Sequence, residues 1–554
     1  MVTRAHFPKE RERERLSQSS RSPRQISSLL FRHEGSSHTA VVAPEQSKTL
    51  SYAELSRMAK DLAADFQRHG LRPGDRVAIL LPTSIEFATA FFAASAAGAV
   101  VAPLDIYMKR TELLGLLDVL KPWGLVTNPS LHRKLGVDNH SANVCLLELR
   151  DSLAASFPDS NGSRGGGKAG VDESGLFQEW RAPEVAPEED AVLILSSGST
   201  GLPKAVRLSH QAILRNIGMH LESLDIAENI RGLQVLPMNY SYGLIASFLS
   251  ILYSHGTAVM MPTPQPGSVV AAVAQYDVNL VMGTPAIFQY VIEKAPTDLD
   301  FRRSPVRYVT LGGDRCRRYA LNLVSNRLPS ARPYITYGLT EAGPRVSTLP
   351  HRFVKKFPES VGLPLRGVEI SILDERGRRR APREAGEIVI KTPSLMNGYF
   401  GDPARTKSVI RNGLCHTGDI GYLDQRGFLY YLGRKDRQFK FGGRMVNPSV
   451  IEQCIASHPC VREVTVEKSE SAQGERIRAR VKTRGAPRES FPEELRRFCR
   501  RRVASCFVPS EFHFEHEDNY YHKGKVFRPV KEEVPDQATD KPGGARLPAK
   551  EQRA

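Results

Sequence analysis

From residue 51 onward, segments whose apolar residues recur at the spacing of a helix alternate with short apolar segments typical of strands. Ser51 and Glu54 form the pattern of a capping box, and the amphipathic run that follows predicts a helix ending near Arg68. The next apolar segment, Arg76–Leu81, follows a Pro-Gly-Asp turn and predicts a buried strand. Strand–helix–strand alternation of this kind predicts an α/β fold with a mainly parallel sheet.

One uncharged run, Phe87–Leu104, is nearly long enough to cross a bilayer. Its first part is rich in alanine and it ends in Val-Val-Ala-Pro, which favours a buried helix over 87–97 followed by a buried strand over 99–102. No other segment approaches the length of a span. We therefore expect no membrane span and a soluble chain.

Changes in composition divide the chain into parts. Residues 156–190 are rich in Gly, Ser, Pro and Glu, which indicates a loop or insertion. Val368–Leu373 and Gly386–Ile390 predict short antiparallel strands, and a boundary is expected at 433–436. The expected parts are a disordered basic tail over residues 1–35, a large domain over 36–433, a small domain over 434–530 and a polar tail over 531–554.

The charge balance is strongly basic, since 77 Lys and Arg residues against 60 Asp and Glu residues give a formal net charge of +17. Such an excess favours an anionic partner, such as nucleic acid, an anionic membrane, a phosphate-rich cofactor or an acidic protein. Residues 437–554 hold 24 Lys and Arg and 17 Asp and Glu, so +7 of the excess lies there. Because the basic residues are dispersed and not interleaved with aromatic ones, we expect no nucleic-acid partner.

The seven cysteines are scattered, and none forms a Cys-x-x-Cys pair. Neither a zinc site nor a redox dithiol is therefore indicated. The N-terminal segment lacks the apolar core of a secretory signal, and its glutamates argue against a transit peptide. We expect free thiols and a cytoplasmic protein.

A loop rich in glycine and hydroxyl side chains directly follows a strand predicted over 191–195. Backbone N–H groups of such a loop approach a polyphosphate closely, the hydroxyls add donors, and a terminal lysine adds positive charge. The loop contains no Gly-Lys-Ser/Thr sequence, so a Walker A loop is not indicated. The predicted phosphate-binding residues are Ser196, Ser197, Gly198, Ser199, Thr200, Gly201 and Lys204.

The segment Ser196–Lys204 resembles the signature of the AMP-forming adenylating enzymes, a superfamily of acyl-CoA synthetases, peptide-synthetase adenylation domains and firefly luciferase. Further motifs follow in that family's order and approximate spacing: Tyr337-Gly-Leu-Thr-Glu341, Gly386-Glu387, Gly398-Tyr399, His416-Thr-Gly-Asp419, Gly433-Arg434 with Asp436, and Gly524-Lys525. Together they extend over most of the chain. The resemblance implies a large N-terminal domain of mainly parallel sheets flanked by helices, a small β-barrel-like part, and a small mobile α+β C-terminal domain.

The resemblance also implies a reaction in two halves. A carboxylic acid reacts with ATP to give an acyl-adenylate and pyrophosphate, and a phosphopantetheine thiol of CoA or an acyl carrier protein then takes the acyl group. Adenylyl transfer depends on positioning and charge neutralisation, so basic residues and Mg²⁺ are expected to carry it. A catalytically silent relative that only binds nucleotide is the alternative, and the presence of Lys525, Glu341 and Asp419 argues against it.

By the same resemblance, five motif residues surround the nucleotide. Tyr337 stacks on adenine, Thr340 bonds a phosphate, and Glu341 helps to hold Mg²⁺, an ion that prefers oxygen ligands. Asp419 bonds both ribose hydroxyls as an acceptor, and Arg434 is its partner on the ribose and phosphate side. Three glycines complete the expected nucleotide site: Gly312, Gly313 and Gly338.

Lys525 is the lysine that the resemblance assigns to the substrate carboxylate and the α-phosphate. Lys523 is the competing choice, because Asn519-Tyr-Tyr-His522 stands where the family usually has Pro-x-Thr. Asp436 matches the hinge about which the small domain swings between the two half-reactions. The loop that then faces the pantetheine tunnel carries Lys440, Gly442 and Gly443, whose glycines allow close backbone approach.

The kind of acid and the kind of thiol acceptor are each predicted from only a few residues. Asn239 and Tyr240 occupy the position of an aromatic–His pair in many acyl-CoA synthetases. Amino-acid-activating relatives carry an Asp there to pair the ammonium, so an acid without an α-amine is favoured over an amino acid. Thr284 either lines the acyl pocket or starts a helix with a core face. The spacing Asp436-x-Gln438-x-Lys440 resembles adenylation domains that load carrier proteins, which favours an acidic acyl carrier protein over CoA.

Overall fold

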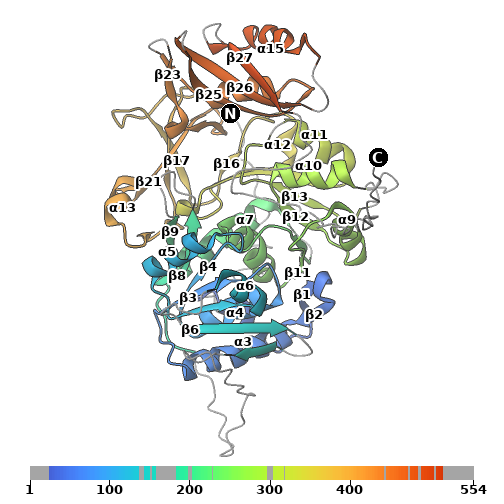
Figure 1. Ribbon diagram of the computed structural model, residues 1–554, viewed down its shortest axis with the longest axis vertical. Coiled ribbons are helices and arrows are strands. Elements are labelled where there is room, and N and C mark those ends of the chain that lie inside the picture. Colours follow the sequence, from blue (N-terminus) through green and yellow to red (C-terminus); the bar gives the residue numbers. More distant parts are fainter. Residues whose placement is uncertain are drawn as a thin grey trace, which may run out of the picture.

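The computed structural model describes residues 24–136, 143–149, 153–156, 182–196, 203–226, 229–295, 304–316, 318–441, 444–471, 474–483, 488–503 and 507–515. These residues form an elongated molecule, with a large domain of three sheets followed by a small C-terminal domain. Helix α3 (Tyr52–Arg68) lies at one end, and strands β25 (Val461–Ser471), β26 (Gly474–Thr483) and β27 (Glu511–Glu515) lie at the other (Figure 1).

An eight-stranded sheet contains the first β–α–β units of the chain. Its strands are, in spatial order, β19 (Gly398–Tyr399), β9 (Lys204–Ser209), β8 (Asp190–Ser196), β4 (Val100–Pro103), β3 (Arg76–Leu80), β5 (Gly124–Thr127), β6 (Asn143–Leu149) and β7 (Leu153–Ser156). From β8 to β6 all neighbours are parallel. Parallel neighbours require crossover connections, and helices provide them here. These are α4 (Ile85–Ala96), α5 (Arg110–Leu120) and α6 (Pro129–Leu135).

A nine-stranded sheet forms the second layer of the large domain. Its order is β16 (Leu363–Pro364), β15 (Ser347–Leu349), β14 (Arg332–Tyr337), β13 (Tyr308–Leu311), β12 (Leu280–Gly283), β10 (Arg231–Gln234), β11 (Thr257–Met260), β1 (Thr39–Ala43) and β2 (Lys48–Ser51). The neighbours from β14 to β1 are parallel, and the strands at both edges are antiparallel.

The remaining helices of the large domain connect or cover these sheets. They are α2 (Ser28–Phe31), α7 (His210–Leu224), a π-helix (Tyr242–Leu249) continuing into α8 (Ser250–Tyr253), α9 (Pro266–Gln275), α10 (Pro285–Lys294), α11 (Arg318–Arg327), α12 (His351–Val354) and α13 (Pro403–Val409). One continuous apolar core joins both sheets through fully buried aromatic side chains such as Phe91, Phe92 and Phe248. The carboxyl ends of the parallel strands are thereby held rigidly.

A third, antiparallel sheet follows the nine-stranded one. It consists of β17 (Glu369–Leu373), β18 (Gly386–Lys391), β21 (Leu414–Leu423), β20 (Ile410–Arg411) and β22 (Leu429–Arg434). A short 3₁₀ turn over Lys435–Arg437 ends it, at the expected boundary of the small domain.

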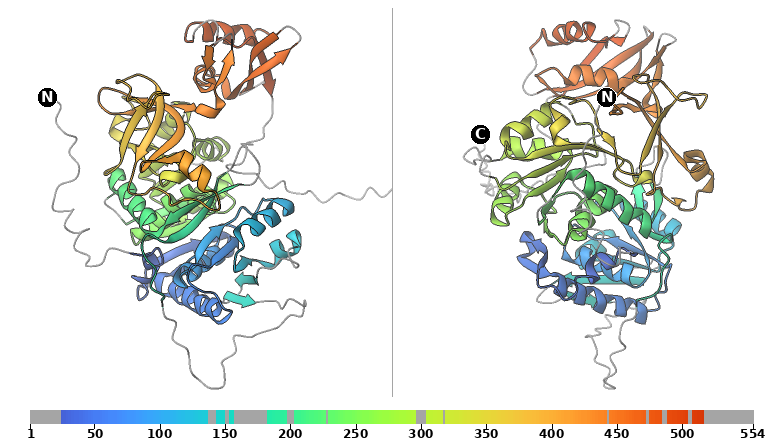
Figure 2. Two further views of the ribbon diagram at one scale, coloured as in Figure 1. Left: turned by 90° about the vertical axis from the view of Figure 1, so that its left-hand side faces the viewer. Right: turned by 180° about the vertical axis from the view of Figure 1, so that it is seen from behind.

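The small C-terminal domain has its own core and lies beyond the large domain in both views of Figure 2. It contains β23 (Phe439–Phe441), β24 (Arg444–Val446), α14 (Pro448–Ala456), β25 (Val461–Ser471), β26 (Gly474–Thr483), α15 (Phe491–Arg500) and β27 (Glu511–Glu515). The predicted fold class, a large domain of mainly parallel sheets with a small α+β domain, is confirmed.

Local predictions from the sequence agree with this fold. Ser51 caps α3, since its Oγ accepts from Glu54 N at 3.2 Å while Ser51 N donates to Glu54 Oε2 at 2.8 Å. The uncharged run folds as a fully buried helix and strand, α4 and β4. Within the described ranges, every helix is too short or too polar to span a bilayer.

Two boundary predictions need correction. A disordered tail through residue 35 is wrong for residues 24–35, because Ile26, Leu29 and Leu30 are fully buried around α2. The amide of Ile26 also donates to Nδ1 of His210 at 3.2 Å. The loop expected over 156–190 is shorter by one residue at each end, since β7 includes residue 156 and β8 begins at 190. Residues 182–189 contain no strand or helix. Residues 157–181 lie outside the described residues.

Candidate active site

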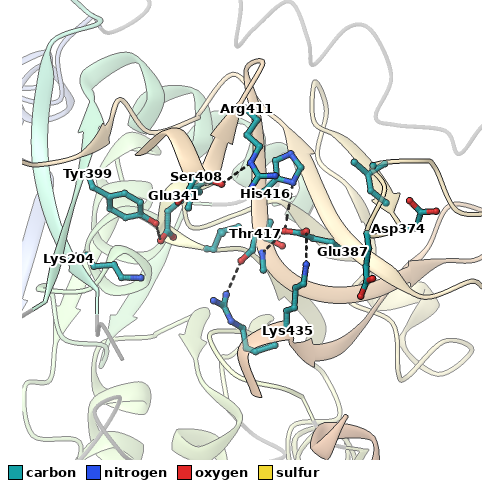
Figure 3. Close-up of a pocket in the computed structure, with 17 residues that line it drawn as sticks. Lys204, Glu341, Asp374, Glu387, Tyr399, Ser408, Arg411, His416, Thr417 and Lys435 are labelled. Atoms are coloured by element: carbon teal, nitrogen blue, oxygen red, sulfur yellow. Dashed lines mark hydrogen bonds and ion pairs between the residues drawn. The ribbon is translucent and has the colours of Figure 1, made fainter. Parts of the chain in front are cut away.

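A cavity of about 310 Å³ lies where β9 begins, beside the 3₁₀ turn Thr340–Ala342 and the antiparallel sheet (Figure 3). Several predicted motifs meet there although they are far apart in the sequence. Lys204 and Glu341 lie at one side and Thr417 lies at another (Figure 3). Gly418 and Arg434 also line the cavity. The positive charges of Lys204 and Arg434, together with the carboxylate of Glu341 in the same cavity, suit a polyphosphate with a divalent cation.

Glu341 is held by a tyrosine that the sequence analysis gave no role. The hydroxyl of Tyr399 donates to Glu341 Oε1 at 2.8 Å (Figure 3). Burial, and then the charge of Glu341, raise the pKa of Tyr399, so the phenol keeps its proton and remains a donor. The ammonium of Lys204 lies 5.8 Å from the centre of the same ring. Tyr399 therefore orients the Glu341 carboxylate and lies beside the Lys204 ammonium.

The donors present at Glu341 fit a magnesium ion that is completed by phosphate oxygens. Mg²⁺ is usually bound in proteins by one or two carboxylates together with substrate phosphates and water. Glu341 is a half-buried carboxylate with one oxygen engaged by Tyr399. Within the described residues, no group of three or more His, Cys, Asp or Glu side chains is arranged for a metal, so an all-protein cage is not found there.

Asp419, in the middle of β21, contacts the last residues of β14 and β22. Its Oδ2 accepts from the hydroxyl of Tyr337 at 2.6 Å, and its Oδ1 accepts from Arg434 Nη1 at 3.1 Å. Asp419 and Arg434 are direct cross-strand neighbours in β21 and β22, which explains their pairing. Arg434 Nη1 also donates to the carbonyl of Thr417 at 3.0 Å. The predicted partnership of Asp419 and Arg434 is thus present as an ion pair, next to the predicted adenine-side tyrosine.

The electrostatics of this group have two opposing causes. Burial raises the pKa of Asp419, whereas the charge of Arg434 and the hydrogen bond from Tyr337 lower it. The net direction is upward, because the carboxylate is only 5% exposed. A carboxylate has about four lone-pair positions, so Asp419 retains acceptor capacity for two further hydroxyl donors.

The glycines of the predicted nucleotide site permit close packing. A Cβ on Gly312 would lie 2.3 Å from Thr336 Oγ1, and one on Gly338 would lie 2.3 Å from the carbonyl oxygen of Pro344. Gly313 has a positive φ of +76°, a conformation that glycine adopts without strain. These positions therefore require glycine in this fold.

Tyr242 connects this region to the predicted acyl pocket. Its hydroxyl bonds Thr310 Oγ1 at 3.0 Å, and a Cβ on Gly313 would lie 3.1 Å from its ring. Thr284 caps α10 through Ile287 N at 3.4 Å, as expected of a helix start, and its methyl group also faces Gly313. The preceding Ser241 bonds Thr340, with 2.9 Å between their hydroxyl oxygens.

The other predicted residues either do not line the cavity or belong to parts of the chain that the structure does not describe. Tyr240 donates to Asp105 Oδ2 at 3.2 Å and contacts Asn239, and neither residue is among those that line the cavity. Asp436 lies 3.6 Å from Arg434 Nε, and Lys440 is exposed on β23. The residues outside the described part of the chain are Ser197, Gly198, Ser199, Thr200, Gly201, Gly442, Gly443 and Lys525.

The structure adds residues to which sequence reasoning gave no role. Glu387 accepts from Gly418 N at 3.2 Å and lies 3.7 Å from Lys435 Nζ (Figure 3). Arg411 and Asp374 also line the cavity. Glu387 and Tyr399 belong to the recognised motifs Gly386-Glu387 and Gly398-Tyr399, so their place in the site could have been predicted from the sequence. Lys435 stands between the motif residues Arg434 and Asp436, and that was its signal. Arg411 and Asp374 carry no such signal, because only the folding of the antiparallel sheet brings them here.

Comparison with known proteins assigns this chain to a family. A family model described as "AMP-binding enzyme" matches residues 32–400. Because this match covers more than half of the chain, the chain belongs to the AMP-binding enzyme family. The resemblance inferred from the motifs is thus confirmed.

Individual relatives cover nearly the whole chain. The chain is 27% identical to 4-coumarate–CoA ligase 2 of Oryza sativa subsp. japonica over 503 residues, 88% of each protein. It is 29% identical over 480 residues to a feruloyl-CoA synthase of an Amycolatopsis species, covering 86% of this chain and 92% of the relative. o-Succinylbenzoate CoA synthetase from Bacillus subtilis, solved with ATP and magnesium ion, matches with a TM-score of 0.73 and 25% identity over 88% of this chain and 95% of that chain.

Proposed function

We propose that this chain is an AMP-forming carboxylic acid–thiol ligase. The acid attacks the α-phosphorus of ATP and expels pyrophosphate, and a thiol then attacks the acyl carbon of the adenylate and expels AMP. The observation that carries the proposal is the convergence of Lys204, Glu341 and Arg434 on one cavity beside Asp419. Adenylyl transfer needs such positioned charge more than it needs a covalent catalyst.

Each residue has a distinct task in this proposal. Asp419 accepts the ribose hydroxyls and Tyr337 lies against adenine, which orients the nucleotide. Glu341 holds Mg²⁺, which neutralises charge on the phosphates, while Lys204 contacts the phosphate side directly. Lys525 aligns the substrate carboxylate with the α-phosphate. The Tyr399 hydroxyl keeps the Glu341 carboxylate in place.

We further propose CoA as the acceptor thiol and the cytosol as the site of reaction. Support for CoA comes from the names of the relatives, which are CoA ligases and a CoA synthase. The spacing around Asp436 had favoured a carrier protein, and this remains the competing acceptor. The six described cysteines form no disulfide with one another, in keeping with a reducing compartment.

The decisive experiment is acid-dependent ATP–pyrophosphate exchange with the full-length chain, over fatty, aryl and amino acids. Exchange with a carboxylic acid lacking an α-amine is expected. Absence of exchange with every acid would count against the ligase and favour a silent nucleotide-binding relative. Adding CoA or a phosphopantetheinylated carrier protein to the preformed adenylate then identifies the acceptor by the thioester formed.

Lys525 is tested by a matched pair of variants. Lys525→Ala should abolish exchange while retaining ATP binding, because the lysine is proposed to act in the adenylation step. Lys523→Ala should exchange at the rate of the unchanged chain. The reverse result would transfer the role to Lys523.

A further inference from the structure

Arg345 is a buried arginine in the segment between the 3₁₀ turn Thr340–Ala342 and β15. Only 2% of its surface is exposed. Its guanidinium stacks on the ring of Tyr242, with its central carbon 3.8 Å from the ring centre, and its Nη1 donates to the carbonyl of Pro344 at 2.8 Å. Within the described part of the chain, Nε and Nη2 have no hydrogen-bond partner, and the side chain that interacts favourably with the guanidinium is that of Tyr242.

A buried cation without an anion is energetically unfavourable. Burial of a charge costs free energy unless the charge is paired and hydrogen-bonded, and the ring of Tyr242 offsets only part of that cost. Arginine cannot escape the cost by losing its proton, because its pKa is too far above neutral pH. The site therefore calls for an anion that binds from outside the described structure.

Two neighbouring side chains share this unsatisfied character. Both ring nitrogens of the fully buried His220, on α7, have no partner among the described residues, and the same holds for Asn216 Oδ1. Burial, and then the charge of Arg345, lower the pKa of His220, so its imidazole is neutral. Asn216 Nδ2 donates to the Arg345 carbonyl at 2.8 Å, which fixes the segment against α7. The cluster thus carries one positive charge, on Arg345.

Arg345 is connected to the proposed reaction site through Tyr242. The ring that Arg345 covers is the one against which Gly313 packs, close to Thr284. The residue before Tyr242 bonds Thr340, the predicted phosphate ligand. Thr340, Gly313 and Arg345 thus all lie around Tyr242 and the residue before it.

We propose that the acid substrate carries a second carboxylate and that Arg345 binds it through Nε and Nη2. These two nitrogens form one edge of the planar guanidinium, whose parallel N–H groups match the two oxygens of a carboxylate. The substrate class is therefore dicarboxylic acids, activated at one end and held at the other. This inference rests on the proposed ligase function and names the substrate for the same site.

The test compares acids that differ only at the distal end. Straight-chain monoacids from propionic to dodecanoic acid are paired with the diacids of equal length, and cinnamic acid is paired with para-carboxycinnamic acid, all in ATP–pyrophosphate exchange. For at least one pair, kcat/KM should be about tenfold or more higher for the diacid, since a bidentate charged contact is gained. A preference for the monoacid in every pair would overturn the proposal while leaving the ligase function intact.

Variants of Arg345 separate specificity from stability. Arg345→Met should lower kcat/KM for the preferred diacid by about 100-fold and raise that for its monoacid partner, with the KM for ATP unchanged. The gain with the monoacid also shows that the variant is folded. Arg345→Lys keeps the positive charge but loses the two parallel N–H groups. Its kcat/KM for the diacid should lie between those of the unchanged chain and of Arg345→Met. Arg133→Met, at an exposed site on α6, is the matched control and should leave both rates unchanged.

Two results would overturn the proposal. One is an Arg345→Met variant that retains the diacid preference, and it would assign Arg345 a structural role. The other is equal loss of diacid and monoacid activity in a variant with unaltered melting temperature. Absence of exchange with all acids in the unchanged chain is distinguishable from both, because it defeats the ligase function itself.

Discussion

The hydroxyl of Tyr337 donates a hydrogen bond of 2.6 Å to Oδ2 of Asp419, across 82 positions of sequence. The bond connects the last residue of a parallel strand, β14, to the antiparallel sheet. It brings the residue expected at adenine and the residue expected at ribose into direct contact. A direct hydrogen bond therefore holds the two proposed nucleotide contacts together.

Replacement of Asp419 should weaken ATP binding. Asp419→Asn removes a charged acceptor of two ribose hydroxyls, and since a hydrogen bond to a charged group contributes about 1.5–3 kcal/mol, the KM for ATP should rise about 10- to 100-fold. Tyr337→Phe removes one neutral donor, and the rise should be about tenfold or less. Exchange kinetics at saturating acid measure both. Asp277→Asn, exposed after α9, is the control; an unchanged KM in Asp419→Asn would contradict the ribose role.

Glu341 should control the magnesium requirement. In Glu341→Gln the ligand loses its charge, so half-maximal exchange should need about tenfold or more Mg²⁺ at constant ATP. Tyr399→Phe leaves the charge and removes the hydrogen bond of 2.8 Å, so its effect should be smaller. Magnesium titrations of the two variants give the comparison. If Glu341→Gln and the unchanged chain have superimposable titrations, the ion is held elsewhere.

Acid should destabilise the chain through His210. Burial lowers the pKa of His210 from 6.5 to about 4. As the pH falls from 6.5 toward 4, the unfolded chain therefore binds a proton that the folded chain does not, and stability is lost. This one group should lower the free energy of unfolding by about 2 kcal/mol between about pH 7 and about pH 5.

His210→Asn provides the matched variant for that pH dependence. Its side-chain oxygen can replace Nδ1 as the acceptor of the Ile26 amide, but it does not titrate. Urea unfolding at the two pH values should show a loss about 2 kcal/mol smaller in the variant. Parallel pH curves for the two chains would rule out His210 as the source.

Gly338 should not tolerate a side chain. A Cβ there would lie 2.3 Å from the carbonyl oxygen of Pro344, so Gly338→Ala must displace the backbone that carries Thr340 and Glu341. We expect exchange to fall about tenfold or more, because catalytic positioning is sensitive to shifts of this size. Gly267→Ala, near the start of α9 with open space around it, should retain activity and melt at the same or a higher temperature. Equal activities of the two variants would contradict this expectation.

The fold and much of the nucleotide side of the site were predictable from sequence because they depend on local patterns. Capping and periodicity predicted α3 and the buried pair of α4 and β4, and motif spacing indicated Glu341, Asp419 and Arg434. Arg345 was not predictable, since a single arginine after a Gly-Pro pair carries no periodic signal. Its burial follows from packing against Tyr242, more than a hundred positions earlier in the chain. The apolar residues around α2 were missed because only three of them stand out, next to a highly charged segment.

Arg434 touches both the nucleotide side and the boundary of the small domain. It lies 3.1 Å from Asp419 and 3.6 Å from Asp436, within the turn where the large domain ends. One guanidinium contacts both carboxylates. Binding of a ribose at Asp419 and rotation of the small domain about this turn should therefore both change the ion pairs of Arg434. Coupling between two binding events is reciprocal. We therefore expect thermodynamic linkage between the nucleotide and the thiol: an acceptor that selects one orientation of the small domain should change the affinity for AMP by the same factor by which AMP changes the affinity for the acceptor.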